Sequence, residues 1–209
     1  MYKESIDAMK KYMVHKSSPS KLTYISEYLN FSTKYGKFDH LVCFMAGTLA
    51  LGSLNKNRES DLILGEEIAK TCYTLYERSL TGIGPEVVMF DDEMKEEDYN
   101  IKSSIYLLRP ELVESLFILY RITGNTTYCD MGWKIFQSIE KHCKTESGYS
   151  EIKDVNQIPA IKSNGLQSFF LSETLKYLYL LFSPKDFIPL DKFIFNTEAH
   201  LFEVFDISN

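Results

Sequence analysis

The sequence has no long apolar run, no excess of basic residues and no signal-like start. Its longest apolar patch, around residues 177–182, is far shorter than the ~20 residues that a membrane-spanning helix needs. The first residues, Met1 to Asp7, lack the basic region and apolar core of a signal peptide. We therefore expect a soluble chain that encodes no route of its own into the secretory pathway.

Positive charge is also scarce. The 23 basic residues against 29 acidic ones give a net charge of -6, which disfavours a protein that binds nucleic acid by neutralising phosphates. With 10 glycines, 6 prolines and 44% apolar residues, the composition is that of a packed globular protein. The length of 209 residues predicts a single domain, 1–209, without an internal linker.

The four cysteines do not form a Cys-x-x-Cys motif, so neither a zinc knuckle nor a dithiol redox site is indicated. Cys43, Cys72, Cys129 and Cys143 allow three complete pairings, and spacing alone does not choose among them. Two glycosylation sequons, which begin at Asn30 and Asn125, have meaning only in the secretory lumen. Free buried cysteines and chance sequons are the plain alternative.

Apolar residues recur at helical spacing in several blocks, which predicts a mainly helical chain made of helix hairpins. Short extended segments are predicted between them, at 22–28, 86–90, 193–195 and 202–205. The predicted helices cover 4–14, 41–52, 60–78, a helix that Pro110 opens and Gly124 ends, a partner that begins at Thr126 or Thr127, and the block from Leu166 to Leu181.

Glu111 is the first candidate for chemistry. It follows Pro110, so it lies in the first turn of a helix, where free backbone N–H groups favour an ionised carboxylate that suits a general base. Glu114 projects from the same face, and Arg109 lies just outside the helix, placed to bind an oxygen-rich ligand. The plain alternative is an acidic first turn with one salt bridge.

A second candidate is the segment from Asn196 to His200. It presents the hydroxyl and carbonyl of Thr197 and the carboxylate of Glu198, a mixture of oxygens that hard cations such as Ca²⁺ bind. The plain alternative is an ordinary strand end. By local pattern, Asp39 is an N-cap followed by a surface histidine, His40.

Two further features have plainer interpretations. The acidic run 91–98 lacks the alternation of an EF-hand loop and is interpreted as a solvated loop. The aromatic residues, 14% of the chain, exceed what a core of this size requires; most of them are interpreted as core, and the surplus of Tyr and Phe also suits stacking against sugars.

Taken together and in order, these segments resemble the class I alpha-1,2-mannosidases of glycoside hydrolase family 47, in the C-terminal half of the catalytic domain. The resemblance extends from residue 1 to about residue 205, and its Asp-His-Leu-Val-Cys-Phe form is closer to the endoplasmic reticulum members than to the Golgi members. The matching motifs are Asp39-His-Leu-Val-Cys-Phe44, Thr81-Gly-Ile-Gly-Pro-Glu86, Leu107-Leu-Arg-Pro-Glu111, Thr145-Glu-Ser-Gly-Tyr149, the run from Ser168 to Phe182, and Asn196-Thr-Glu-Ala-His200.

The resemblance implies an incomplete (αα)₇ barrel, built of antiparallel helix hairpins with short strands in the connecting loops. It implies calcium-dependent, inverting hydrolysis of terminal alpha-1,2-linked mannose from high-mannose N-glycans on glycoproteins. The implied compartment is the lumen of the endoplasmic reticulum.

The resemblance also implies roles for individual residues. Glu111 matches the carboxylate that activates water, and Thr197 matches the residue that binds calcium through its hydroxyl and carbonyl. Cys43 and Cys72 match a disulfide pair. The positions that line the mannose pocket or hold calcium-bound waters are His40, Glu86, Arg109, Glu114, Glu198 and Gln167, the last standing where the family has a glutamate.

The chain departs from the family in two ways that affect activity. Gln167 lacks an anionic oxygen that the family's glutamate supplies, which should weaken calcium binding. The motif that carries the catalytic acid does not occur in these residues, so we expect poor turnover from the isolated chain. Half of a ring of hairpins would expose apolar helix faces, which predicts a complementary N-terminal half or self-association. The alternative function is a noncatalytic mannose-binding or scaffold protein in glycoprotein quality control.

Overall fold

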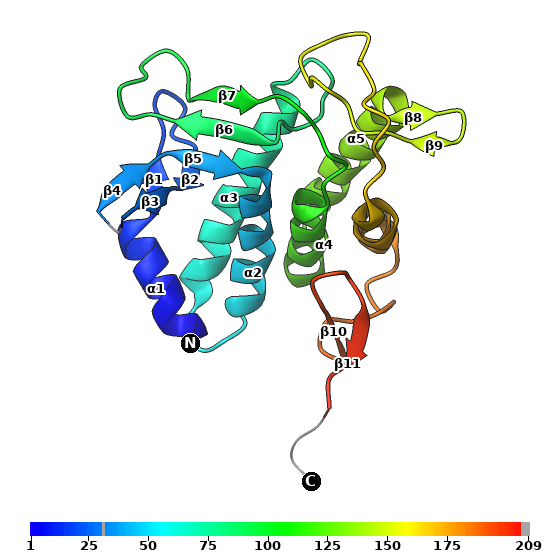
Figure 1. The fold of residues 1–209 in the computed structure, drawn as a ribbon. Helices are drawn as coiled ribbons and strands as arrows, with labels where there is room; N and C mark the ends of the chain where they lie inside the picture. The colour runs from blue at the N-terminus through cyan, green and yellow to red at the C-terminus, as the bar shows by residue number, and fades with distance from the viewer. Residues whose placement is uncertain (31, 206–209) are drawn as a thin grey trace.

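The computed structural model describes residues 1–30 and 32–205, and helices dominate this part of the chain (Figure 1). The mainly helical class predicted from the sequence is therefore confirmed. The α-helices are α1 (Tyr2–Tyr12), α2 (Phe44–Gly52), α3 (Glu59–Glu77), α4 (Glu111–Thr123), α5 (Thr127–His142) and α6 (Leu175–Phe182), with a 3₁₀ turn η1 (His40–Cys43) before α2 and a π-helical segment η2 (Phe170–Thr174) before α6.

The strands are short and pair antiparallel in small separate sheets. The largest sheet has three strands in the order β5-β6-β7, and the others are two-stranded hairpins. The strands are β1 (Val14–Lys16), β2 (Thr23–Ile25), β3 (Glu27–Leu29), β4 (Thr33–Tyr35), β5 (Lys37–Asp39), β6 (Val87–Phe90), β7 (Tyr99–Ser103), β8 (Lys144–Thr145), β9 (Gly148–Tyr149), β10 (Phe193–Phe195) and β11 (Leu201–Glu203).

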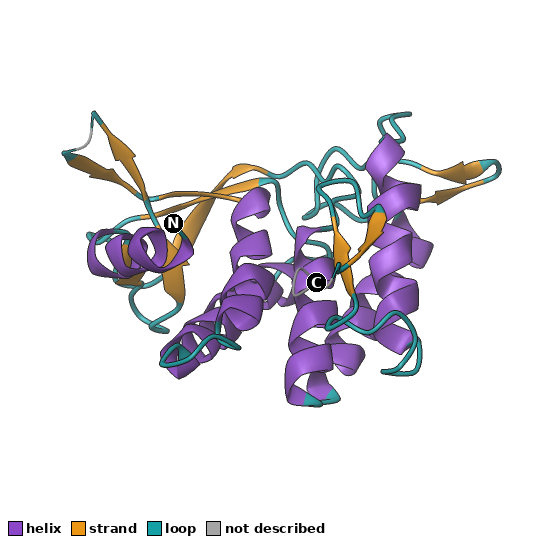
Figure 2. Ribbon diagram, turned by 90° about the horizontal axis from the view of Figure 1, so that it is seen from below, coloured by secondary structure: helices purple, strands orange, loops and turns teal. Residues whose placement is uncertain are grey.

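Helix α4 lies at the centre of the molecule. It packs against α2, α3, α5 and α6, so every other long helix except α1 contacts it. In Figure 2 the strands of the N-terminal part lie to one side of this helical body. The core residues along α4, which include Leu112, Leu116 and Phe117, are fully buried. A side chain at the N-terminus of α4 is therefore attached to a helix that four other helices hold in place.

The limits of α4 follow its sequence signals. Pro110 directly precedes the helix, and Gly124 ends it in the left-handed conformation (φ 75°), with its N–H donating to the carbonyl of Tyr120 at 2.8 Å. The Asn125 side chain then accepts the N–H of Thr127 at 3.0 Å, where α5 begins. The predicted helix pair and its tight turn are confirmed.

The predicted helix from Leu166 to Leu181 is only partly correct. Leu166 lies outside the helix and is exposed, and the segment Phe170–Thr174 has π-helical hydrogen bonding before α6 begins. A π segment inserts an extra residue into a helical turn and shifts the faces that follow, which an apolar pattern does not reveal.

The strand predictions are confirmed in part, and the predicted segment 202–205 overlaps β11 at residues 202–203. The prediction for 193–195 matches β10, and the prediction for 86–90 matches β6 within a residue. The predicted strand 22–28 is two strands, because the chain breaks at Ser26, whose N–H donates to Met13. Strands β1, β4, β5, β7, β8 and β9 were not predicted.

Helices α2 and α4 are joined through Ser115. The N–H of Gly47 donates to the Ser115 hydroxyl at 2.9 Å, and that hydroxyl donates to the carbonyl of Cys43 at 2.6 Å. Ser115 thus completes the first turn of α2 by bridging a donor and an acceptor four residues apart. A Cβ on Gly47 would lie 3.3 Å from the Ser115 Cα, so glycine permits this close approach.

Cys43 and Cys72 form a disulfide that ties η1 to α3, as the resemblance implies. Cys129 and Cys143 are the free cysteines in the described part of the chain, and Cys143 is buried. Of the two sequons, Asn125 lies on the exposed turn between α4 and α5, while Phe31 of the first falls outside the described residues. No helix described here combines the length and apolarity required to cross a bilayer.

We expect removal of the Cys43–Cys72 disulfide to lower the free energy of unfolding by about 3 to 4 kcal/mol, because it closes a loop across 29 positions of sequence. Urea unfolding of the double variant C43A/C72A measures this loss. The matched control is C129A, which removes a half-buried free thiol and should cost about 1 kcal/mol or less. Equal losses in both variants would contradict a stabilising disulfide.

Candidate active site

Glu111 is the first residue of α4 and is buried, with 8% of its surface exposed. The chain that leads into it is conformationally constrained. Leu108 has a φ of 62°, which is uncommon for a leucine, and the Thr174 hydroxyl donates to its carbonyl at 2.7 Å. The strained turn, Pro110 and the packed helix together fix the position of the Glu111 carboxylate.

His40 forms the closest contact of the Glu111 carboxylate. The His40 Nδ1 lies 2.8 Å from Glu111 Oε2, and its Nε2 lies 2.6 Å from the hydroxyl of Tyr76. His40 is 2% exposed, so the local interpretation of a surface histidine is wrong. Asp39 occupies the predicted N-cap position, in front of η1, but its side chain makes no capping hydrogen bond and pairs with Lys37 instead. Asp39 also ends strand β5, and its carboxylate accepts a hydrogen bond from Lys37 of the same strand.

Arg109 forms a two-point ion pair with Glu86. The distances are 3.1 Å from Nε to Oε2 and 2.6 Å from Nη2 to Oε1. Its Nη1 lies 3.8 Å from Glu111, and the guanidinium lies over the ring of Phe169 at 5.5 Å. Arg109 therefore links the segment before β6 to the start of α4 and places positive charge beside Glu111.

A cavity of about 370 Å³ opens beside Glu111. Three carboxyl groups line it, from two elements: Glu111 and Glu114 of α4, and Glu173 of the π segment. The remaining lining residues are Leu41, Phe44, Phe195, Asn196 and Thr197. The cavity combines oxygen ligands with an apolar and aromatic wall, which is the composition of a sugar or small polar ligand site.

The carboxyl groups differ in protonation. Burial raises the pKa of Glu111, but the hydrogen bond from His40, a backbone hydrogen bond and the nearby charge of Arg109 outweigh burial, so the net pKa is below its usual value. Burial raises the pKa of Glu114 to about 7, and the charges of Glu173 and Glu111 add to this against a hydrogen bond from Tyr177. Burial likewise raises the pKa of Glu173 to about 7. Glu111 is thus the carboxylate that stays ionised.

Thr197 reaches the cavity from the loop that joins β10 and β11. Asn196 shapes this loop, because its side-chain oxygen accepts the N–H groups of Glu198 at 3.0 Å and His200 at 2.9 Å. Lys176 of α6 donates to the carbonyl of Ala199 at 2.9 Å, and Ala199 is buried. The loop is therefore anchored to the same helix whose preceding segment carries Glu173.

The other predicted site residues do not line this cavity. Glu198 is exposed, although its charge contributes to the raised pKa of Glu173. Gln167 donates to the carboxylate of Glu151, which also accepts from Ser163 at 3.0 Å. Glu86 and Arg109 form an ion pair with each other, and neither lines the cavity. The structure thus gathers Glu111, Glu114 and Thr197 and leaves Glu198 and Gln167 apart.

Glu173 and Tyr76 are functional candidates that the sequence analysis missed. The available signal for Glu173 was a single carboxylate within an apolar helical run, three residues after the buried Phe170. No local signal marks Tyr76, because its contact with His40 joins residues 36 positions apart.

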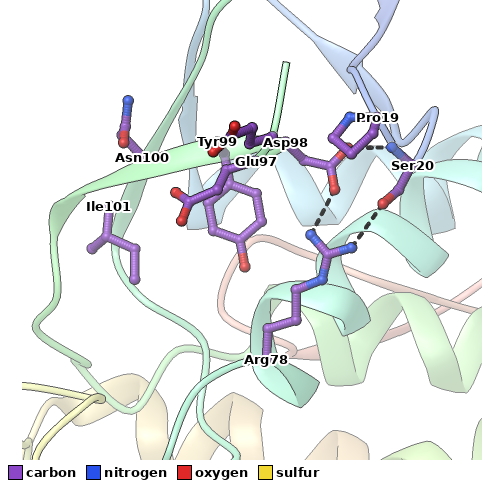
Figure 3. Close-up of a pocket in the computed structure, with 9 residues that line it drawn as sticks. Pro19, Ser20, Arg78, Glu97, Asp98, Tyr99, Asn100 and Ile101 are labelled. Carbon is purple, nitrogen blue, oxygen red and sulfur yellow. Dashed lines mark hydrogen bonds and ion pairs between the residues drawn. The ribbon is translucent and has the colours of Figure 1, made fainter. Parts of the chain in front are cut away.

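A larger cavity, of about 460 Å³, lies away from these carboxylates (Figure 3). Arg78 points into it and is already paired with Asp98 at 2.7 Å and with Ser20 at 3.0 Å. This arginine of the cavity wall is therefore already neutralised by Asp98. Asp98 is 3% exposed, so the interpretation of the acidic run as a fully solvated loop is wrong at this position.

Residues 1–30 and 32–205 contain no group of three or more His, Cys, Asp or Glu side chains arranged to hold a metal ion. The cavity nevertheless offers oxygen donors of the kind that Ca²⁺ prefers, from Thr197, Asn196 and the three glutamates. Calcium takes six to eight oxygen ligands and retains waters, so a carboxylate cage is not required. The residues present fit a calcium ion whose direct protein ligands are few.

A family model described as Glycosyl hydrolase family 47 matches residues 1–204. The chain belongs to glycosyl hydrolase family 47. It is 44% identical to mannosyl-oligosaccharide 1,2-alpha-mannosidase MNS3 of Arabidopsis thaliana, over 96% of this chain and 37% of that protein. It is 45% identical to a mannosyl-oligosaccharide 1,2-alpha-mannosidase of Candida albicans, over 100% of this chain and 42% of that protein.

A solved member of the family has the same fold. The alpha-1,2-mannosidase from Trichoderma reesei superposes with a TM-score of 0.89 at 30% identity, covering 95% of this chain and 45% of that one. This family 47 chain therefore spans less than half the length of these relatives. The predicted family is confirmed, and the helix hairpins and disulfide described above are features of a family 47 chain.

We expect Asp98→Asn to destabilise the protein by about 2 kcal/mol at pH 7. Burial raises the pKa of Asp98, but hydrogen bonds from Ser17, Arg78 and Ser20 lower it more, to about 2. A depressed pKa stabilises the fold above the unfolded value near 4, and this stabilisation is lost as the pH falls toward 2. Urea unfolding should show nearly the same difference at pH 7 and pH 5 and a smaller one at pH 3. The control, exposed Glu97→Gln, should give little change, and a pH-independent loss in Asp98→Asn would contradict the account.

Gln167→Glu should lower the free energy of unfolding by about 1 kcal/mol at pH 7, because it replaces the donor to Glu151 with a second carboxylate. The loss should shrink as the pH falls and one carboxyl group protonates. Thermal unfolding from pH 4 to pH 7 measures it. The exposed Gln137→Glu serves as control, and a stabilised Gln167→Glu variant would mean that Glu151 does not need this donor.

Proposed function

We propose that this chain carries the base side of a mannosyl-oligosaccharide 1,2-alpha-mannosidase active site. The proposed substrate is terminal alpha-1,2-linked mannose on high-mannose N-glycans, hydrolysed with inversion. One observation supports this most: a buried carboxylate, Glu111, is held ionised by His40 at the wall of an oxygen-lined cavity that Thr197 also reaches.

Glu111 is suited to take a proton from water. Its lowered pKa keeps it ionised at neutral pH, and its position in the first turn of α4 fixes the accepting oxygen. His40 holds one carboxylate oxygen, so the orientation of the group is set. In an inverting glycosidase the base lies across the sugar from an acid, with roughly 6.5 to 9.5 Å between the two carboxyl groups.

Glu114 and Glu173 are suited to bind sugar hydroxyls. With pKa values of about 7, each is able to donate or accept a hydrogen bond near neutral pH. Phe44 and Phe195 supply apolar surface against which a sugar face packs. The cavity therefore offers both the polar and the apolar contacts that a mannose residue requires.

We propose Ca²⁺ as the cofactor, held by the hydroxyl and carbonyl of Thr197 and completed by water. When bound, a calcium ion orients water and sugar hydroxyls. Thr197, Asn196 and the glutamates of the cavity supply oxygen donors for such an ion and its waters.

Turnover by the isolated chain is proposed to be poor, because the family motif that carries the acid does not occur in its 209 residues. A complementary N-terminal half or self-association is proposed to cover exposed apolar side chains such as Trp133, Tyr179 and Phe182. The proposed compartment is the endoplasmic reticulum lumen, since an oxidising environment preserves the Cys43–Cys72 disulfide.

Calcium should raise the melting temperature of the purified chain by about 5 to 10 °C at an excess of roughly 100-fold over its dissociation constant. Thr197→Val, which removes a hydroxyl ligand, should abolish most of this rise. The matched control is Thr126→Val, because Thr126 is exposed and its hydroxyl makes no hydrogen bond in the described structure. A chain that calcium leaves unchanged, or equal shifts in both variants, would contradict the proposal.

Calorimetry with alpha-1,2-mannobiose in calcium completes the test. Heat of binding without release of mannose supports a binding site that lacks its acid. Absence of binding together with absence of a calcium effect would refute the proposed function.

A further inference from the structure

His40 makes two hydrogen bonds, and its ring has no free nitrogen. Nδ1 lies 2.8 Å from Glu111 and Nε2 lies 2.6 Å from the Tyr76 hydroxyl. Both partners are nearly inaccessible to solvent, because Tyr76 is 2% exposed and Glu111 is 8% exposed. Water therefore has little opportunity to replace either contact.

The proton positions follow from the partners. An ionised Glu111 only accepts hydrogen bonds, so Nδ1 must carry the proton. In a neutral imidazole the other nitrogen then has a lone pair and needs a donor. The Tyr76 hydroxyl is that donor, and it remains protonated because burial, with the charge of Glu111 adding, raises its pKa well above the usual value.

The Tyr76 ring is held in place from two sides. A Cβ on Gly84 would lie 2.3 Å from the Tyr76 ring, so the backbone of Gly84 lies directly against that ring. The ring of Tyr106, fully buried, packs edge-on at a centroid distance of 6.3 Å. Tyr76 is thus a rigid donor and not a mobile side chain that happens to lie near His40.

We propose that Tyr76 is a positioning residue that sets the tautomer of His40: its hydroxyl donates to Nε2, so that the neutral ring carries its proton on Nδ1 and donates it to Glu111. The identification of Glu111 as a base rests on the proposed function, but the assignment of donors and acceptors from Tyr76 through His40 to Glu111 does not. The Tyr76 hydroxyl thereby determines which form of His40 Nδ1 lies beside Glu111: the N–H of a neutral ring, the N–H of an imidazolium, or a lone pair.

The consequence of losing this hydroxyl is specific. In Tyr76→Phe the Nε2 lone pair would be buried without a donor, which is costly. The ring would then move its proton to Nε2, which takes the donor away from Glu111, or take up a second proton. In either case the ratio of the Nδ1–H form to the other forms should fall by about tenfold or more.

The test is long-range ¹H–¹⁵N NMR of the histidine rings in the full chain at pH 7. Wild-type His40 should be neutral, with a protonated Nδ1 and an unprotonated Nε2. His40→Gln identifies the signal among the four histidines. A wild-type ring that carries its proton on Nε2, or on both nitrogens, would overturn the proposal without any further variant.

Tyr76→Phe should change the His40 signal to the Nε2–H or doubly protonated form. The matched control is Tyr73→Phe, one helical turn earlier on α3, where the ring is also buried and its hydroxyl forms no hydrogen bond in the described structure. Far-ultraviolet circular dichroism checks that each variant is folded. A folded Tyr76→Phe with an unchanged tautomer would overturn the proposal. The calcium and mannobiose experiments measure the proposed function separately, so either hypothesis can fail alone.

Discussion

The hydrogen bond between His40 and Glu111 keeps a carboxylate charged in a place where burial alone would protonate it. Burial acts on Glu111, Glu114 and Glu173 alike, and it raises the pKa of the latter two to about 7. Of these three carboxyl groups, only Glu111 has a buried histidine donor and a nearby arginine, and only the pKa of Glu111 is lowered. One carboxyl group of the cavity is therefore ionised at neutral pH, while the other two are partly protonated, and this difference gives them different chemical roles.

The rest of the fold serves to place these groups. Helix α4 packs against four other helices, the disulfide ties η1, which begins at His40, to α3, and Ser115 ties the start of α2 to α4. The π segment presents Glu173 toward the same cavity, and the anchored loop after β10 presents Thr197. Residues separated by up to 157 positions of sequence therefore meet at one end of a single helix: His40 at one extreme and Thr197 at the other.

The sequence predicted the parts of this arrangement that depend on local signals. Pro110 and Gly124 mark α4 because each has one favoured backbone conformation at a helix end. The π segment and six of the short strands were missed because two to five residues hold too little periodicity. His40 was misread locally because its partners lie on distant elements, and Glu173 and Tyr76 were missed for the same reason. The disulfide and the family came from resemblance, not from spacing.

Thr197 and the carboxylates of α4 line one cavity, and we propose that this cavity holds a divalent cation. Crystals of the full chain soaked with a lanthanide that substitutes for calcium test it by anomalous scattering. An ion bound at this site should give one strong peak in the cavity, about 2.3 to 2.6 Å from the Thr197 hydroxyl. A peak only in the cavity beside Arg78, or none within reach of Thr197, would contradict the proposal.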